Sequence, residues 1–102
     1  LEHRTGQALD SLSLSLSEDE RAAVLFATGR AWGRLFEAFE AERDQPTDAA
    51  TRKASYETMR ADFRAAIAKA TSDAQADAIT HRLATEIGLT PGRFVDHDSD
   101  GQ

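Results

Sequence analysis

The sequence predicts an all-α protein, an antiparallel helical hairpin plus a third, shorter helix, which we expect to assemble as a four-helix-type bundle in a homodimer. Two observations carry this prediction. Apolar residues recur three and four positions apart over two segments of about two dozen residues each, which is the helical period. Capping signals precede the long first segment and the short third one, so the helix starts are marked independently of the periodicity.

The 102 residues and their 40% hydrophobic content fit one folded domain. We divide the chain into an extended N-terminal arm over residues 1–16, a helical hairpin and bundle domain over residues 17–89, and an acidic flexible tail over residues 90–102. A chain of this size buries only about 60–65% of its unfolded surface, so a lone hairpin is marginally stable. Burial against a second copy would relieve this shortage.

The arm contains a strict alternation of serine and leucine over residues 11–17. In an extended chain this alternation puts Leu12, Leu14 and Leu16 on one side. No second strand-like segment is available to pair with it, so we expect the arm to lie over a helical core. A short helix over residues 1–9 is the alternative for the start of the arm.

The first long helix is expected from Ser17 to about residue 43. Ser17 and Glu20 form a capping box, and Pro46 follows the expected end. At about 100° per residue, one arc of about 100° collects the side chains that we expect in the core. They are Leu25, Trp32, Leu35, Phe36 and Phe39.

Gly29 and Gly33 lie beside this stripe. Each glycine costs about 1 kcal/mol relative to alanine inside a helix, so a compensating role is expected. Close approach of another backbone, or room for a ring such as Phe63, would provide it. Phe26 points about 100° away from Leu25, and a dimer would bury it better than a monomer.

The second helix is expected from an N-cap at Thr47 or Asp48 to about Ala70. Its linker of about four residues forces it to return antiparallel to the first helix. Its apolar stripe has the same three-and-four spacing. The stripe consists of Tyr56, Met59, Phe63, Ala66, Ile67 and Ala70.

The third helix has marked ends. Ser72 and Gln75 form a second capping box, and Gly88 supplies the left-handed residue at the C-terminus, followed by Leu89 and Pro91. Its expected buried stripe is Ala76, Ile79, Leu83 and Ile87.

The charge pattern limits the function classes. The net charge is −6 and the pI is near 4.9, which disfavours nucleic acid and anionic membrane surfaces as partners. The longest apolar run, residues 22–27, is far shorter than the ~20 residues that cross a bilayer. Cysteine is absent, which excludes disulfides and thiolate chemistry. No cofactor is expected, and the compartment stays open.

Two patterns suggest metal ions. Asp77 and His81 share a helix face at a spacing of four and form a candidate transition-metal site, with a surface hydrogen bond between them as the alternative. The tail residues Asp96, Asp98 and Asp100 match the first half of a calcium-binding EF-hand loop. A solvated acidic tail is the preferred interpretation, because Gly88 and Pro91 interrupt the helix that should lead into that loop.

The sequence therefore predicts a non-enzymatic helical protein–protein interaction module, a subunit, adaptor or regulator that acts as a dimer. The expected partner is a second copy of the chain, with a second protein as a further partner. The expected contact residues come from the arm, the glycine strip and the aromatic positions. They are Leu12, Leu14, Leu16, Phe26, Gly29, Trp32, Gly33, Phe36, Tyr56 and Phe63.

The alternative function is a small-molecule- or metal-responsive sensor. Residues 16–21 (LSEDER) and 70–75 (ATSDAQ) resemble the paired Leu-Thr-x-x-Gln edges of the Spy-type periplasmic stress chaperones and metal-resistance sensors, although the second segment lacks the leucine. The resemblance covers about residues 12–79 and implies a helical hairpin that dimerises.

Overall fold

The computed structural model describes residues 2–89 of the chain. These residues form four helices in chain order and, in this range, no strand. The helices are α1 (Glu2–Asp10), α2 (Glu18–Asp44), α3 (Ala49–Ala70) and α4 (Asp73–Ile87). The all-α class is thereby confirmed. The tail prediction and its candidate calcium ligands lie outside the described residues.

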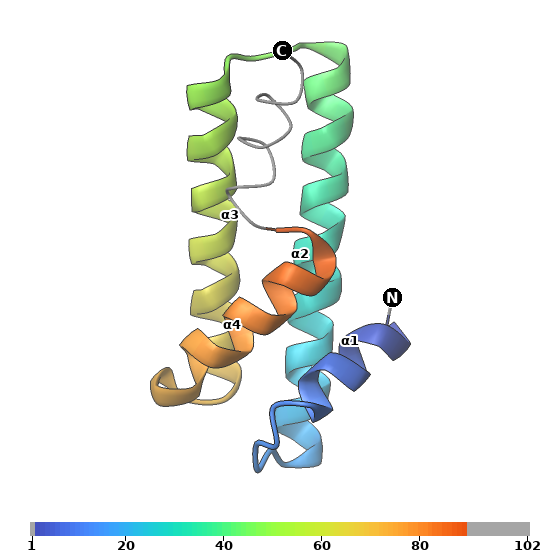
Figure 1. Cartoon of the computed structure of the whole chain (residues 1–102), viewed down its shortest axis with the longest axis vertical. Coiled ribbons are helices and arrows are strands. Elements are labelled where there is room, and N and C mark those ends of the chain that lie inside the picture. The colour runs from blue at the N-terminus through green and yellow to red at the C-terminus, as the bar shows by residue number, and fades with distance from the viewer. Residues whose placement is uncertain (1, 90–102) are drawn as a thin grey trace.

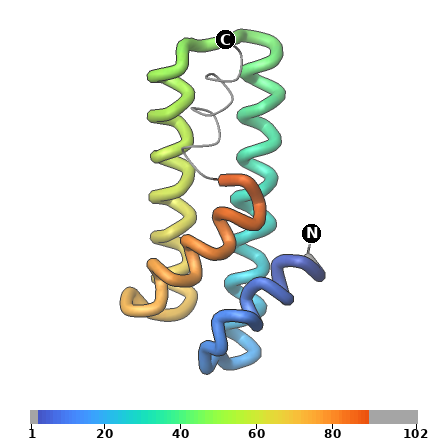
Figure 2. Tube along the Cα trace, viewed as in Figure 1, coloured from blue at the N-terminus to red at the C-terminus, as the bar shows by residue number. Residues whose placement is uncertain are grey.

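The two long helices α2 and α3 run antiparallel and set the long dimension of the molecule, which measures 44 × 24 × 21 Å (Figure 1). Helix α4 crosses one face of this hairpin obliquely, and α1 lies beside α4 against the same end of α2, as the trace in Figure 2 also shows. The described part is therefore a hairpin with two short helices packed on one face, which is compatible with a bundle.

The helix ends follow from the predicted caps. The Ser17 hydroxyl accepts from the Glu20 amide at 3.1 Å, and the Glu20 carboxylate accepts from the Ser17 amide at 2.8 Å, which is the predicted capping box. Asp48, one of the two predicted candidates, caps α3. Ser72 caps α4 by accepting from the Gln75 amide at 3.3 Å, but the second predicted capping box is incomplete, since the Gln75 side chain makes no return bond to the Ser72 amide. At the end of α4, Gly88 has φ 84°, and the Leu89 amide donates to the Ala84 carbonyl oxygen at 2.7 Å.

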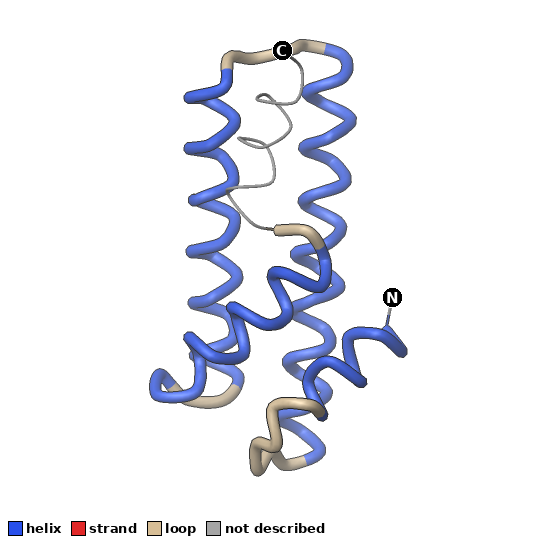
Figure 3. The backbone as a smooth tube through the Cα atoms, viewed as in Figure 1, coloured by secondary structure: helices blue, strands red, loops and turns tan. Residues whose placement is uncertain are grey.

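The N-terminal arm differs in part from the expectation. Residues 2–10 form α1, so only residues 11–17 lie outside helices in this segment (Figure 3). Helix α1 forms because Thr5, Ala8 and Leu9 fall on one side of it and are buried. The expected burial of the leucines is confirmed, since Leu12, Leu14 and Leu16 pack partly buried against the core while the serines between them are exposed. The segment is not extended throughout, because residues 11–12 form a turn and Ser13 has φ 54°.

The buried stripes of α3 and α4 match the prediction closely. All four predicted residues of α4 are buried, as are four of the six predicted for α3, with Ala66 exposed and Ala70 only partly covered. Both stripes belong to one core cluster, which also includes residues of α1 and α2. The core residues from these two helices are Tyr56, Met59, Phe63, Ile67, Ala76, Ile79, Leu83, Ala84 and Ile87.

The predicted core stripe of α2 is wrong for two of its five members. Trp32 and Phe36 are exposed, Leu25 and Phe39 are partly covered, and only Leu35 is buried. The buried residues of α2 are instead Val24, Thr28, Ala31 and Leu35. At about 100° per residue their direction is rotated by roughly 70° from the predicted stripe.

Small and polar residues explain this rotation. The Thr28 hydroxyl donates to the Val24 carbonyl oxygen at 2.8 Å, so its burial leaves no unpaired polar group. Ala31 presents only a methyl group, which lets the neighbouring helices approach closely. The packing therefore selects the smaller face of α2 and leaves its largest rings outside.

Candidate interaction surface

Outside its buried face, α2 carries the large exposed hydrophobic residues of the described chain. Phe26 is 68% exposed, Trp32 42% and Phe36 52%. Gly29 and Gly33 lie among them on the same side. We call these five residues the outer α2 face. An exposed aromatic group of this kind is unusual for a monomer and typical of contact surfaces.

The aromatic rings of the outer α2 face are ordered by neighbours on the same helix. The rings of Trp32 and Phe36 stack with centroids 5.7 Å apart, and the guanidinium of Arg30 lies 6.0 Å from the centre of the Phe26 ring. Residues four apart share a helix face, so α2 itself holds both arrangements. Each ring of the outer α2 face therefore has a neighbour on its own helix.

The two glycines serve no packing purpose within the described chain. A Cβ atom added at Gly29 or at Gly33 would meet nothing within 4 Å. The prediction that they make room for Phe63 is wrong, because Phe63 is buried in the core and reaches neither position. Their helix-propensity cost, about 1 kcal/mol each, is left without compensation inside the chain.

The other five expected contact residues pack within the chain itself. Tyr56 and Phe63 are 2% and 3% exposed, so they are core residues and are not available to a partner. Leu12, Leu14 and Leu16 are partly covered by their own chain. The structure thus brings five of the ten expected contact residues together, namely those of the outer α2 face.

A groove between α2 and α3, which the sequence interpretation missed, lies beside this surface. Its volume is about 450 Å³, and Phe26 forms one wall. Its floor is apolar, with Ala27, Met59 and Phe63. Its polar lining consists of Arg30, Lys69 and the ion pair between Arg34 and Asp62. Single-helix periodicity cannot reveal it, since small residues of two helices must face each other to leave the space.

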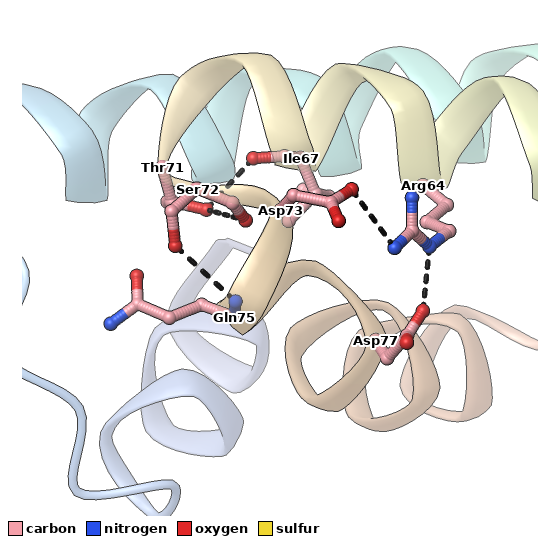
Figure 4. A network of polar contacts seen from close by, with 7 residues as sticks. All are labelled: Arg64, Ile67, Thr71, Ser72, Asp73, Gln75 and Asp77. Carbon is pink, nitrogen blue, oxygen red and sulfur yellow. Dashed lines mark hydrogen bonds and ion pairs between the residues drawn. The ribbon is translucent and has the colours of Figure 1, made fainter.

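One member of the expected metal pair, Asp77, is engaged by another side chain. Arg64 Nε donates to Asp77 Oδ1 at 2.6 Å and Arg64 Nη2 to Asp73 Oδ1 at 3.2 Å, which ties α3 to the start of α4 (Figure 4). These hydrogen bonds lower the pKa of Asp77 and raise that of Arg64. His81 is exposed, and Asp77 and His81 both line a hollow between α3 and α4.

A metal at Asp77 would have to displace Arg64. Within residues 2–89 there is no cluster of three or more histidine, cysteine or carboxylate side chains arranged to hold a metal ion. The Asp77–His81 site therefore stays a prediction that needs ligands from elsewhere.

Among the described residues, no helix is both long enough and apolar enough to cross a membrane. No protein-family model, curated protein or solved structure is significantly similar to the chain.

Proposed function

We propose that this chain is a non-enzymatic interaction module that acts as a homodimer through the outer α2 face. The observation that carries the proposal is the exposure of Phe26, Trp32 and Phe36 on one side of a single helix. Aromatic residues and arginine dominate the energetically important positions of protein contacts. The acidic net charge of −6 favours a protein partner over a nucleic acid.

Burial also supports self-association. The fold buries Thr28 and Ala31 of α2 and leaves the rings of Trp32 and Phe36 exposed, so a monomer keeps apolar surface in contact with water. Burying apolar surface gains about 25 cal/mol per Å², and an aromatic side chain contributes some 150–250 Å² when it is fully covered. Association would recover the area that the fold leaves in water.

Sedimentation velocity over a concentration series tests the proposal. We expect the wild-type chain to sediment as a dimer at micromolar concentration and Phe36→Asp to sediment as a monomer, because a carboxylate in the contact would lose its hydration. Ala65→Asp is the matched control, since it adds the same charge at an exposed position of α3. A wild-type chain that stays monomeric at high concentration would refute the proposal.

A second candidate function rests on the groove between α2 and α3. Its apolar floor and the cations of Arg30 and Lys69 favour an amphipathic carboxylate, in line with a small-molecule-responsive sensor. A thermal-shift series with medium-chain carboxylates and the corresponding alcohols tests it. We expect the acids to raise the melting temperature of the wild-type chain. Ala66→Trp should abolish this stabilisation because the indole fills the groove, and Ala65→Trp should leave it intact. The same response in all three proteins would reject the site.

A further inference from the structure

A second feature of α2 defines how two copies would meet. Exposed positions follow each other at alternating spacings of three and four along the whole helix, on the side opposite the buried Val24, Thr28 and Leu35. This 3.5-residue period is the one that lets two helices pack along their length. The positions are Asp19, Ala22, Phe26, Gly29, Gly33, Phe36, Glu40 and Arg43, all exposed except the half-buried Gly33. We call them the α2 seam.

The α2 seam is symmetric about Ala31. In an antiparallel pair whose two-fold axis passes at the level of Ala31, Phe26 lies opposite the partner's Phe36 and Gly29 opposite the partner's Gly33. The same register sets Asp19 opposite the partner's Arg43. Rings thus meet rings, glycines meet glycines and opposite charges meet at both ends.

We propose that two copies of the chain associate through antiparallel α2 helices in this register, which specifies the geometry of the dimer proposed above and rests on it. The glycines lie next to the axis, where the absence of side chains allows the two backbones to approach. Their open surroundings within the chain fit this role, since a Cβ at either position would meet nothing within 4 Å. The Phe26 and Phe36 rings then close the contact on either side of the glycines.

Charge decides between the antiparallel and the parallel arrangement. A parallel pair in register places Asp19, Glu40 and Arg43 each against its own copy, giving three like-charge contacts. The antiparallel pair replaces two of these with two Asp19–Arg43 contacts and sets Glu40 against the partner's Ala22. Arg43 would exchange its exposed 3.5 Å contact with Asp44 for this pair. Antiparallel helix dipoles add to the preference.

The flanks of the seam differ from each other. One flank carries Leu25 and Trp32, so the two Trp32 side chains come near each other beside the axis. The other flank carries Arg30, which lies over Phe26. In the proposed dimer, the Arg30 side chains of the two copies come near each other. This like-charge pair opposes association, so Arg30→Gln should tighten the dimer severalfold, with salt reducing the difference.

Cross-linking measures the register directly, because the natural sequence contains no cysteine. We would prepare Ala22→Cys and Glu40→Cys, mix them and oxidise the mixture under conditions where the chain is a dimer. The mixture should give the disulfide-linked Ala22→Cys/Glu40→Cys heterodimer, identified by mass. Each variant alone should stay unlinked, because an antiparallel pair separates two copies of position 22 by about 27 Å along the helix.

The outcomes separate the register from the proposed function. A sedimenting dimer in which each variant links to itself would indicate a parallel pair and overturn the register while leaving the interaction module in place. A sedimenting dimer that forms neither link would also overturn the register, since the two positions would lie outside the contact. A chain that remains monomeric in sedimentation would remove both proposals together.

Discussion

Leu35 and Phe36 are adjacent in the sequence and lie about 100° apart around α2, and this step takes the side chain from 2% exposed at Leu35 to 52% exposed at Phe36. Leu35 packs in the core formed with α3 and α4, and Phe36 stacks on Trp32 outside it. This boundary separates the residues that hold the monomer together from those that we assign to the dimer contact.

The pair gives the first prediction. Leu35→Ala should lower the free energy of unfolding by about 2–5 kcal/mol, because it leaves a cavity in the core. Phe36→Ala should change the unfolding free energy of the monomer by less than about 1 kcal/mol, since surface substitutions cost little. Urea unfolding at concentrations below dimer formation measures both, and equal losses for the two variants would mean that Phe36 is a core residue.

Replacing the glycines of the outer α2 face should change monomer stability and self-association in opposite directions. Gly29→Ala and Gly33→Ala should each stabilise the monomer by up to about 1 kcal/mol, because alanine is the better helix former and the new methyl group meets no neighbour. The same changes should weaken self-association, since the methyl groups separate the two backbones at the proposed axis. Urea unfolding gives the first effect and sedimentation equilibrium the second; an alanine variant that dimerises more tightly would contradict the proposed contact.

Gly88 should respond in the opposite way to the same substitution. Its φ of 84° lies in the left-handed region, where a side chain costs about 1–2 kcal/mol. Gly88→Ala should therefore destabilise the chain by that amount through the end of α4, without altering the dimer dissociation constant. Thermal unfolding monitored by circular dichroism measures the loss, with Gly29→Ala as the comparison.

Acid should destabilise the fold through carboxylates that are hydrogen-bonded in the native state. The Thr47 hydroxyl and amide lower the pKa of Glu42 from its ordinary 4.5, and Arg64 lowers that of Asp77 from 3.8. Because each folded-state pKa lies below the unfolded one, the stabilisation is present above the ordinary value and is lost as the pH falls through the lowered value.

Unfolding free energies measured in urea between pH 7 and acid should therefore decline below about pH 4.5. The double variant Glu42→Gln/Asp77→Asn should show a flatter profile in this range, with its curve closest to that of the wild type at low pH. A wild-type profile as flat as that of the double variant would show that neither carboxylate is coupled to folding.

Much of the fold could be predicted from local sequence. The caps at Ser17 and Ser72 and the left-handed Gly88 are short-range hydrogen-bonding and conformational signals, and each is found where the pattern places it, whereas the choice of Asp48 over Thr47 was left open. The stripes of α3 and α4 were predictable because their apolar residues occupy one side each. Helix α1 was harder to predict, since a short helix depends on burial of Thr5, Ala8 and Leu9 against other helices.

The candidate surface depended on a choice that the sequence of α2 leaves open. That helix has apolar residues on two sides, so periodicity alone cannot tell which side enters the core. Tertiary packing buried Val24, Thr28, Ala31 and Leu35, because the small side chains of Thr28 and Ala31 on this face allow the neighbouring helices to approach. Thus the local sequence determined where the long helices begin and end, and only the packing of four helices decided that the largest rings of α2 remain outside.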